Sequence, residues 1–307
     1  MRLLTVATII ALSTSAAFAA ECSKVTFSDV GWTDITATTA TTSAVLKGMG
    51  YETETRMLSL PVTYISMEEG KVDVFLGTWL PTMEADLKPY REKKTIDTIR
   101  ANLQGAKYTL ATNEAGAKLG ITSFSTIAKH ADALKNTIYG IEPGNDGNRL
   151  IMSMIEKNAF DLEAFKLRES SEQGMLSQVL RLTKRDKPVV FLGWEPHPMN
   201  SSFKLTYLSG GDDYFGPDYG GATVYTNTRA GYAEECPNVG KLLNNLEFSL
   251  QMENEIMGYI LEEGMKADEA ATRWLKDNPS VLDQWLDGVT TRDGAKALPA
   301  VKAALGL

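Results

Sequence analysis

The chain has 307 residues, of which 43% are apolar and 23% charged, and its formal net charge at pH 7 is −8. Disordered proteins, collagens and coiled coils have compositions far from these values, so these classes are excluded. The length predicts two domains of about 150 residues each, and no nucleic-acid partner is expected because phosphate backbones repel an acidic surface.

The first 19 residues differ from the rest of the chain. Arg2 supplies a short positive region, residues 3–12 form an apolar run, and Ala17-Phe18-Ala19 is a small-x-small cleavage site. This pattern is typical of a secretory signal peptide over residues 1–19. The alternative is a membrane anchor, but the apolar run is far shorter than the roughly 20 residues that span a bilayer. We therefore expect an exported protein.

The chain contains two cysteines, Cys22 and Cys236. Cysteines pair in the oxidising compartments that exported proteins reach, so the sequence predicts a disulfide between Cys22 and Cys236. Glu21 stands directly before Cys22, where a bacterial lipoprotein signal has a small residue. Lipid attachment at this cysteine is therefore not expected.

Apolar strands alternate with amphipathic helices along the mature chain. The expected strands are, in chain order, residues 24–28, 51–60, 72–76, 107–111, 137–141, 165–168, 189–192, 204–208 and 223–226. Helices are expected over residues 38–48 and from Pro61, and the chain from Pro237 onward is expected to be wholly helical. This order indicates α/β architecture with mainly parallel sheets.

Two of the expected strands end in similar sequences. Residues 74–81 read Val-Phe-Leu-Gly-Thr-Trp-Leu-Pro, and residues 190–196 read Val-Phe-Leu-Gly-Trp-Glu-Pro. A third strand is followed by Gly31 and Trp32. Ligands of open α/β sheets bind at the carboxyl ends of strands, so the tryptophans that follow these glycines are candidates for one cleft. The alternative is a packing role in the core, which we expect for Trp274 and Trp285 in the C-terminal helices.

The sequence offers little for catalysis. It has two histidines and lacks the patterns of a nucleophile elbow, a phosphate-binding loop, a dinucleotide-binding loop or a metal site, so no enzymatic activity, metal or cofactor is expected. Residues 144–148, Gly-Asn-Asp-Gly-Asn, either cap the helix that follows or place polar side chains in the cleft.

Aromatic rings together with a carboxylate favour a bulky cation, because the ring quadrupole presents negative faces. A quaternary ammonium suits such a pocket best. Its methyl groups pack against the rings, and it has no N–H donors that burial would leave unpaired.

Several motifs together resemble those of a known family, the periplasmic substrate-binding proteins of ABC importers for glycine betaine, proline betaine and choline. The resemblance spans essentially the whole mature chain. It rests on Gly31-Trp32, Asp34, Gly77-Thr-Trp79-x-Pro81, Tyr108-Thr-Leu-Ala-Thr112, Gly144-Asn145-Asp146 and Gly193-Trp194-x-Pro196-His197. The predicted disulfide also fits this family.

The resemblance implies a two-lobe periplasmic-binding-protein fold of type II, in which each lobe has a central, mainly parallel sheet flanked by helices. Lobe I would take residues 20–109 and 211–307, and lobe II residues 110–210. Two segments would cross between the lobes, which close on the ligand by a hinge motion. Gly210 and Gly211 would serve the second crossing, where glycine absorbs backbone rotation.

The resemblance also implies the ligand and the residues that bind it. An aromatic box would surround the trimethylammonium group of choline, formed by Trp32, Trp79, Tyr108 and Trp194. Asp34 and Asn145 would hydrogen-bond the hydroxyl end of choline, and the charge of Asp34 would also favour the cation. Choline is favoured over glycine betaine, since an ionised Asp34 would repel the carboxylate of betaine. The roles of His197 and Arg149 stay open, because either side chain pairs with a carboxylate if it reaches the cleft.

The expected function is therefore that of a monomeric periplasmic receptor that captures choline and delivers it to a membrane permease. Acetylcholine and betaines would be weaker ligands, and a glycine betaine or proline betaine binding protein of the same family is the alternative. Two rivals from other classes are a secreted enzyme that acts on a choline ester, with Asp34 or His197 as base, and a sensory module that reports to a membrane receptor. The enzyme is disfavoured because the sequence shows no recognisable nucleophile.

Overall fold

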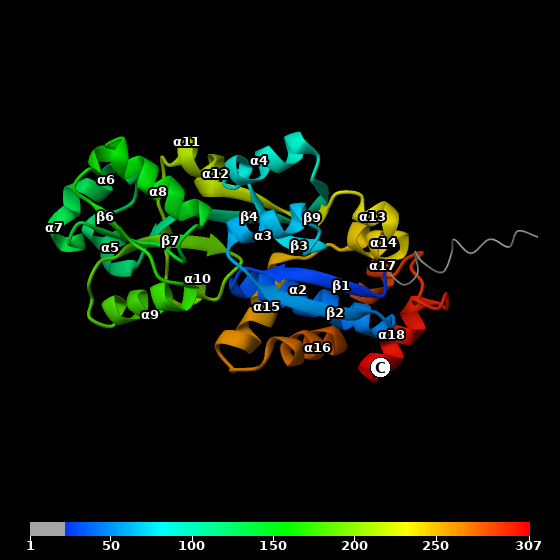
Figure 1. Ribbon diagram of the computed structural model, residues 1–307. Coiled ribbons are helices and arrows are strands. Elements are labelled where there is room, and N and C mark those ends of the chain that lie inside the picture. The colour runs from blue at the N-terminus through cyan, green and yellow to red at the C-terminus, as the bar shows by residue number, and fades with distance from the viewer. Residues whose placement is uncertain (1–21) are drawn as a thin grey trace, which may run out of the picture.

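The computed structural model describes residues 22–307, drawn in colour in Figure 1. The expected signal peptide, residues 1–19, lies outside the described residues. In the part of the chain that is described, no helix has both the length and the apolar character needed to cross a membrane.

A nine-stranded sheet forms the centre of the molecule, in the order β2-β1-β3-β9-β4-β7-β5-β6, with β8 paired to β4. The strands are β1 (Lys24–Asp29), β2 (Glu52–Met57), β3 (Val74–Leu80), β4 (Ile96–Thr112), β5 (Thr137–Tyr139), β6 (Lys166–Arg168), β7 (Val190–Glu195), β8 (Thr206–Tyr207) and β9 (Gly221–Arg229). Every segment that the sequence predicts as a strand overlaps one of these strands.

The direction of the strands differs between the ends and the middle of the sheet. Strand β1 is parallel to β2 and β3, and β5 is parallel to β6 and β7. In the middle, β9 pairs antiparallel with β3 and with β4, and β4 pairs antiparallel with β7. The fold class is confirmed, but the expectation of mainly parallel sheets is wrong for this central part, because β9 returns from the second crossing in the opposite direction and inserts between β3 and β4.

Helices cover both faces of the sheet (Figure 1). The helices before the second crossing are α2 (Thr33–Gly48), α3 (Leu60–Glu68), α4 (Glu84–Lys93), α5 (Glu114–Leu119), α6 (Phe124–Ile127), α7 (Ala131–Leu134), α8 (Asp146–Glu156), α9 (Glu172–Thr183) and α10 (Met199–Ser202), with the short 3-10 helices η1 (Ala128–His130) and η2 (Ala159–Asp161). The later ones are α11 (Asp212–Phe215), α12 (Pro217–Gly220), α13 (Tyr232–Glu235), α14 (Pro237–Asn245), α15 (Leu250–Leu261), α16 (Ala267–Asp277), α17 (Val281–Trp285) and α18 (Ala297–Leu305). The helical C-terminal part is confirmed, apart from an isolated bridge between Thr290 and Lys296.

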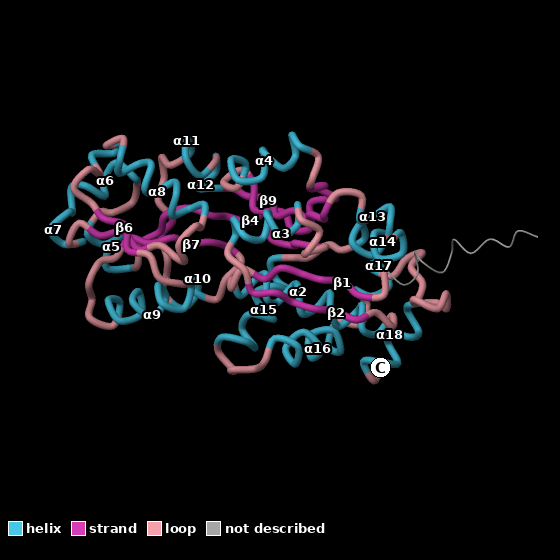
Figure 2. The backbone as a smooth tube through the Cα atoms, viewed as in Figure 1, coloured by secondary structure: helices cyan, strands magenta, loops and turns pink. Residues whose placement is uncertain are grey.

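The molecule has two lobes that share the sheet. Figure 1 shows α5 to α10 in one lobe and α2 with α14 to α18 in the other, and Figure 2 shows strands in both. Strand β4 runs from one lobe into the other, since residues 96–107 pair with β9 and residues 107–112 pair with β7. The chain returns between β8 and β9, where Gly210 has a φ of 79°. The lobe boundaries at residues 109 and 211 stay predictions.

Helix α2 is buried along most of its length between the sheet and helices α15, α16 and α18. Several of its buried residues are threonines, whose hydroxyls donate to carbonyl oxygens one turn earlier in the helix: Thr38 to Asp34 (3.1 Å), Thr41 to Ala37 (2.8 Å) and Thr42 to Thr38 (2.9 Å). These bonds satisfy polar groups that would otherwise be costly to bury. They also fix the first turn of α2, which carries Asp34.

The predicted disulfide between Cys22 and Cys236 is confirmed, with the two Cα atoms 5.6 Å apart. It joins the segment before β1 to the start of α14. The packing role predicted for Trp274 and Trp285 is also confirmed. Both are buried, and their indole nitrogens donate to the Glu255 carboxylate (2.7 Å) and the Glu247 carbonyl (3.2 Å) respectively.

Candidate ligand-binding site

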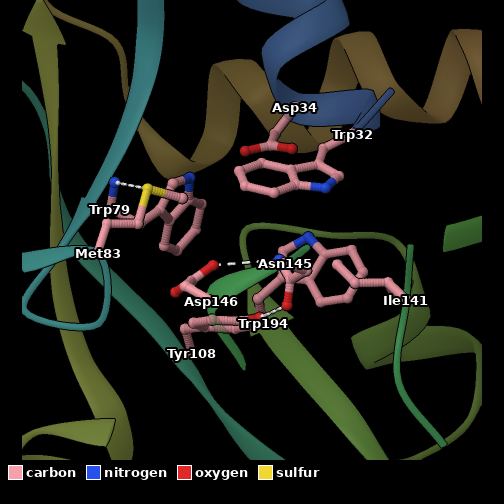
Figure 3. Close-up of a pocket in the computed structure, with 9 residues that line it drawn as sticks. All are labelled: Trp32, Asp34, Trp79, Met83, Tyr108, Ile141, Asn145, Asp146 and Trp194. Atoms are coloured by element: carbon pink, nitrogen blue, oxygen red, sulfur yellow. Dashed lines mark hydrogen bonds between the residues drawn. The ribbon is translucent and has the colours of Figure 1, made fainter. Parts of the chain in front are cut away.

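A cavity lies between the two lobes, and Figure 3 shows the side chains that surround it. It is lined by Trp32, Asp34, Trp79, Met83, Tyr108, Ile141, Asn145, Asp146 and Trp194. The structure therefore brings together all of the residues that the sequence predicts as ligand-binding. Met83, Ile141 and Asp146 also line the cavity but were not predicted to bind ligand.

The lobe I side of the cavity is built from the ends of β1 and β3. Gly31 has a φ of 86°, which glycine adopts at little cost, and it turns the chain from β1 toward α2. Trp32 is the N-cap residue of α2, and Asp34 lies in its first turn. Trp79 is the next-to-last residue of β3. These positions at the carboxyl ends of two parallel strands agree with the prediction from the Gly and Trp motifs.

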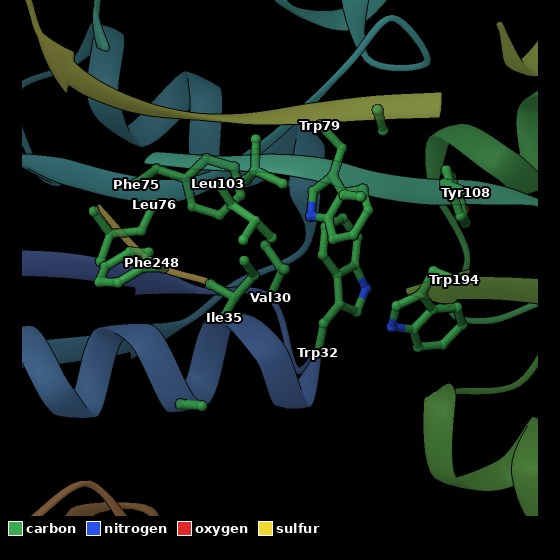
Figure 4. Packing of buried hydrophobic residues seen from close by; sticks show 14 of the residues in the cluster. Val30, Trp32, Ile35, Phe75, Leu76, Trp79, Leu103, Tyr108, Trp194 and Phe248 are labelled. Atoms are coloured by element: carbon green, nitrogen blue, oxygen red, sulfur yellow. The ribbon is translucent and has the colours of Figure 1, made fainter. Parts of the chain in front are cut away.

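The opposite side of the cavity carries Tyr108, at the crossing in β4, and Trp194 in β7, which are direct cross-strand partners. Their ring centroids are 6.4 Å apart with planes at 76°, and the Tyr108 ring is 6.1 Å from the Trp79 ring at 61°. Such edge-to-face arrangements are favoured by aromatic pairs. Figure 4 shows Trp32 and Trp79 together at the end of the lobe I core, with Tyr108 and Trp194 beyond them on β4 and β7.

Asn145 connects the N-terminus of α8 to the ring of Tyr108. Its Oδ1 accepts hydrogen bonds from the Asn148 backbone N–H (3.1 Å) and from the Tyr108 hydroxyl (2.9 Å). Its Nδ2 donates to Asp146 Oδ1 (3.1 Å). Residues 144–148 thus cap a helix and also face the cleft, so both alternatives that the sequence left open hold. The second amide hydrogen of Asn145 has no acceptor among residues 22–307.

Gly147 allows this close contact between α8 and β4. A Cβ atom at this position would lie 2.1 Å from the Tyr108 hydroxyl oxygen and 3.0 Å from Leu192. Any side chain at residue 147 would therefore push the Tyr108 ring away from the N-terminus of α8.

Two buried carboxyl groups line the cavity, each with one oxygen that has no hydrogen-bond partner in the described chain: Asp34 Oδ1 and Asp146 Oδ2. Burial raises the pKa of Asp34 to about 8, and the negative charge of Glu172 acts in the same direction. Burial also raises the pKa of Asp146 to about 6, although the nearby Thr82 hydroxyl opposes the shift. Within residues 22–307, no cluster of His, Cys, Asp and Glu is arranged to hold a metal ion.

Hydrogen bonds cross between the lobes beside the cavity. The Trp32 indole N–H donates to Glu142 (2.9 Å), and burial raises the pKa of this glutamate to about 7. Glu172, the first residue of α9, accepts from the backbone N–H of Thr33 (2.9 Å) and from the Thr33 hydroxyl. A residue of lobe II thereby holds the start of α2, the helix that carries Asp34.

His197 and Arg149, whose roles the sequence left open, do not line the cavity. His197 Nδ1 accepts from the backbone N–H of Met199 (3.0 Å), so Nε2 carries the proton and donates to Glu172 (3.2 Å). The His197 ring also packs edge-on against Trp194, with centroids 5.1 Å apart. Arg149 donates to the Thr82 carbonyl (3.1 Å) and to Asp86 (2.7 Å).

A family model for the substrate binding domain of the ABC-type glycine betaine transport system matches residues 23–277. The chain belongs to this family. Its members are substrate-binding domains of a transport system, so the function of the family is binding and transport rather than catalysis.

Solved structures of this family extend the comparison. The chain is 66% identical to an ABC-transporter choline binding protein in complex with choline, over 94% of this chain and 99% of that one, with a TM-score of 0.93. A structure described as the unliganded, semi-closed conformation of an ABC-transporter choline binding protein is also 66% identical, over 94% of this chain and 100% of that one, with a TM-score of 0.86. Lactococcal OpuAC, closed around glycine betaine, is 26% identical over 85% of this chain and 98% of that one, with a TM-score of 0.77. The backbone is thus more similar to the choline-bound structure than to the semi-closed one.

Proposed function

We propose that this protein is a periplasmic substrate-binding protein that captures choline in the cavity between its lobes and delivers it to the membrane permease of an ABC importer. The observation that carries the proposal is the composition of the cavity wall, which combines indole and phenol rings with two buried carboxyl groups that each have an unpaired oxygen. The 66% identity to a choline binding protein solved with choline supports it.

The rings suit the trimethylammonium end of choline. A cation near the face of a Trp or Tyr ring gains about 0.5 to 2 kcal/mol, the larger values applying when water is excluded. All of the rings in the wall are buried, each with about 5% or less of its surface exposed. The residues that line the cavity include no Lys, Arg or His. Both titratable groups of the wall are therefore acidic, and a cationic ligand favours the ionised form of each.

The hydroxyl end of choline finds both a donor and an acceptor. The amide nitrogen of Asn145 would donate its second hydrogen to the hydroxyl oxygen of choline. The unpaired Oδ1 of Asp34 would accept a hydrogen bond from the hydroxyl group. Glycine betaine instead brings a carboxylate to this position. Because Arg149 and His197 are hydrogen-bonded elsewhere, no cation of the wall pairs with that carboxylate, and this favours choline.

Other observations support a periplasmic location and delivery of choline to a permease. The sequence pattern of residues 1–19 directs export, and the disulfide fits an oxidising compartment such as the periplasm. Membership of a transport family supports a permease as the partner. In this account lobe II, residues 110–210, closes on lobe I when choline enters, and the closed monomer docks on the permease.

Titration of the purified mature protein tests the proposal directly. Tryptophan fluorescence is followed while choline, acetylcholine, glycine betaine or proline betaine is added, since three of the residues that line the cavity are tryptophans. We expect a saturable response to choline, with weaker binding of the other ligands. A response to glycine betaine without one to choline would instead assign the protein to betaine transport.

A further inference from the structure

Asp146 is a second acidic residue in the cavity wall, and the contacts proposed for the hydroxyl of choline do not use it. It is the first residue of α8, has 1% of its surface exposed and lines the cavity. Its Oδ2 has no hydrogen-bond partner among the described residues. A buried carboxyl oxygen without a partner is costly unless a ligand or a counter-charge occupies the space beside it.

The orientation of this carboxyl group is fixed by its neighbours. Asn145 donates to Asp146 Oδ1 (3.1 Å), and Asn145 is itself held by the Tyr108 hydroxyl and the Asn148 backbone N–H. Figure 3 shows Asp146 beside Asn145 and near Trp79 and Tyr108, whereas Asp34 lies beside Trp32. The two acidic groups therefore approach the cavity from different sides.

Among the described residues, only partial positive charge lies near this carboxyl group. Arg149, on the same helix, is bound to Asp86 and to the Thr82 carbonyl, so its charge is shared. The N-terminus of α8 favours a negative charge at this position. A quaternary ammonium cannot donate a hydrogen bond, so a carboxylate recognises it by charge alone. Asp146 is placed to supply that charge next to the rings.

We propose that Asp146 sets the charge requirement of this site: its carboxylate selects a cationic ligand over a neutral ligand of the same shape and over a zwitterion. This inference rests on the proposed function, since it assigns a specificity role within the same cavity. It separates two tasks. Asn145 recognises the hydroxyl group, Asp146 with the rings recognises the positive charge, and Asp34 contributes to both.

The test compares choline with 3,3-dimethyl-1-butanol, which has the same shape but carries carbon in place of the charged nitrogen. The ratio of the two affinities measures recognition of charge apart from shape. In Asp146→Asn, which keeps an acceptor for Asn145, we expect choline affinity to fall about tenfold or more while the neutral alcohol changes by about twofold or less. Glycine betaine, which carries no net charge, is expected to lose less affinity than choline.

The matched control is Asp213→Asn, which removes one negative charge from an exposed residue of α11 outside the cavity. Its affinity ratio is expected to equal that of the wild type. Thermal unfolding checks that each variant folds, and Asp146→Glu serves as a second variant that keeps the charge. A ratio in Asp146→Glu closer to the wild type than to Asp146→Asn supports the inference.

Two results would overturn the inference alone: an unchanged ratio in Asp146→Asn, or equal losses in Asp146→Glu and Asp146→Asn, which would mean that shape rather than charge matters. Both assume that the wild-type protein binds choline. A wild-type protein that does not bind choline would overturn the proposed function, and the inference would fall with it.

Discussion

At the scale of single residues, we expect the aromatic side chains and Asp34 to contribute separately to binding. Tyr108 in β4 and Trp194 in β7 are cross-strand partners whose rings meet edge to face. Asp34 lies in the first turn of α2 and is expected to meet the ligand through Oδ1, which has no partner among the described residues. Changes at these positions are therefore expected to alter affinity more than folding.

Replacing Trp194 with alanine removes one wall of the cavity. We expect choline affinity to fall about tenfold or more in Trp194→Ala, because a ring contact worth up to about 2 kcal/mol is lost and water reaches the cation. Isothermal titration calorimetry measures the change. Trp274→Phe, in a helix outside the cavity, is the control and should bind like the wild type. Wild-type affinity in Trp194→Ala would remove this residue from the site.

The raised pKa of Asp34, about 8, predicts that choline binding depends on pH. A cation favours the ionised form of the carboxyl group, so binding shifts its pKa downward and releases a proton at neutral pH. Affinity for choline should then rise as the pH increases from about 6 to about 8, and level off above the pKa. Asp146, with a pKa of about 6, is half ionised at pH 6 and almost fully ionised at pH 8, so it contributes only to the lower end of this rise.

Calorimetry in buffers of different ionisation enthalpy counts the protons that choline binding releases. In Asp34→Asn we expect the proton release near pH 7 to fall and the rise in affinity above pH 7 to flatten. An affinity that is constant between pH 6 and pH 8 in the wild type would contradict the assignment of Asp34 to the ligand.

At the scale of elements, the site depends on where strands end and where α8 begins. The sequence predicts this well for the motifs in which glycine precedes tryptophan, because a buried strand followed by such a turn is a local signal. It also predicts the box itself, through the resemblance of several motifs to one family. Every strand position was found, although the early part of β4, residues 96–106, was missed. Charged residues and Gly105 interrupt the apolar pattern there.

Other features could not be predicted because they depend on contacts between distant segments. The antiparallel middle of the sheet follows from the insertion of β9 between β3 and β4, which no local pattern records. For Asp146 the sequence leaves open both a helix cap and a polar side chain in the cleft, and its place in the cavity depends on Tyr108 holding Asn145. The role of His197 depends on Glu172, which lies 25 residues away in the sequence.

The close contact between α8 and β4 makes Gly147 a sensitive position. In Gly147→Ala the new methyl group would lie 2.1 Å from the Tyr108 hydroxyl, so we expect the ring to shift and choline affinity to fall about tenfold or more. Titration calorimetry and a thermal melt report the two effects. Gly258→Ala, in α15, is the control and should leave affinity unchanged, because the added atom would make only an ordinary contact with the Glu262 carboxylate at 3.9 Å. Unchanged binding in Gly147→Ala would mean that the Tyr108 position is not critical.

At the scale of the whole molecule, contacts between the lobes hold the cavity closed. They join residues predicted to belong to different lobes: Trp32 with Glu142, Thr33 with Glu172, and Thr82 with Arg149. They stabilise the arrangement that is more similar to the choline-bound relative than to the semi-closed one. The affinity for choline therefore depends in part on residues that do not touch it.

Glu172 offers the clearest test of these contacts. We expect choline to dissociate about tenfold faster from Glu172→Ala, because hydrogen bonds to a charged group contribute about 1.5 to 3 kcal/mol and the closed form loses them. Glu172→Gln removes the charge and keeps only one of the two acceptor oxygens, so it separates the loss of charge, which also acts on the pKa of Asp34, from the loss of the whole contact. Stopped-flow fluorescence gives the rates. Wild-type dissociation from both variants would show that this contact does not hold the lobes together.

A crystal structure of the mature protein with choline tests directly whether the rings between the lobes bind the cation. We predict the choline nitrogen within about 6 Å of the ring centroids of Trp32, Trp79, Tyr108 and Trp194, with Asp146 beside it. The hydroxyl group should contact Asp34 and Asn145. Choline bound outside this cavity, or a quaternary nitrogen turned toward solvent and away from the rings, would contradict the account.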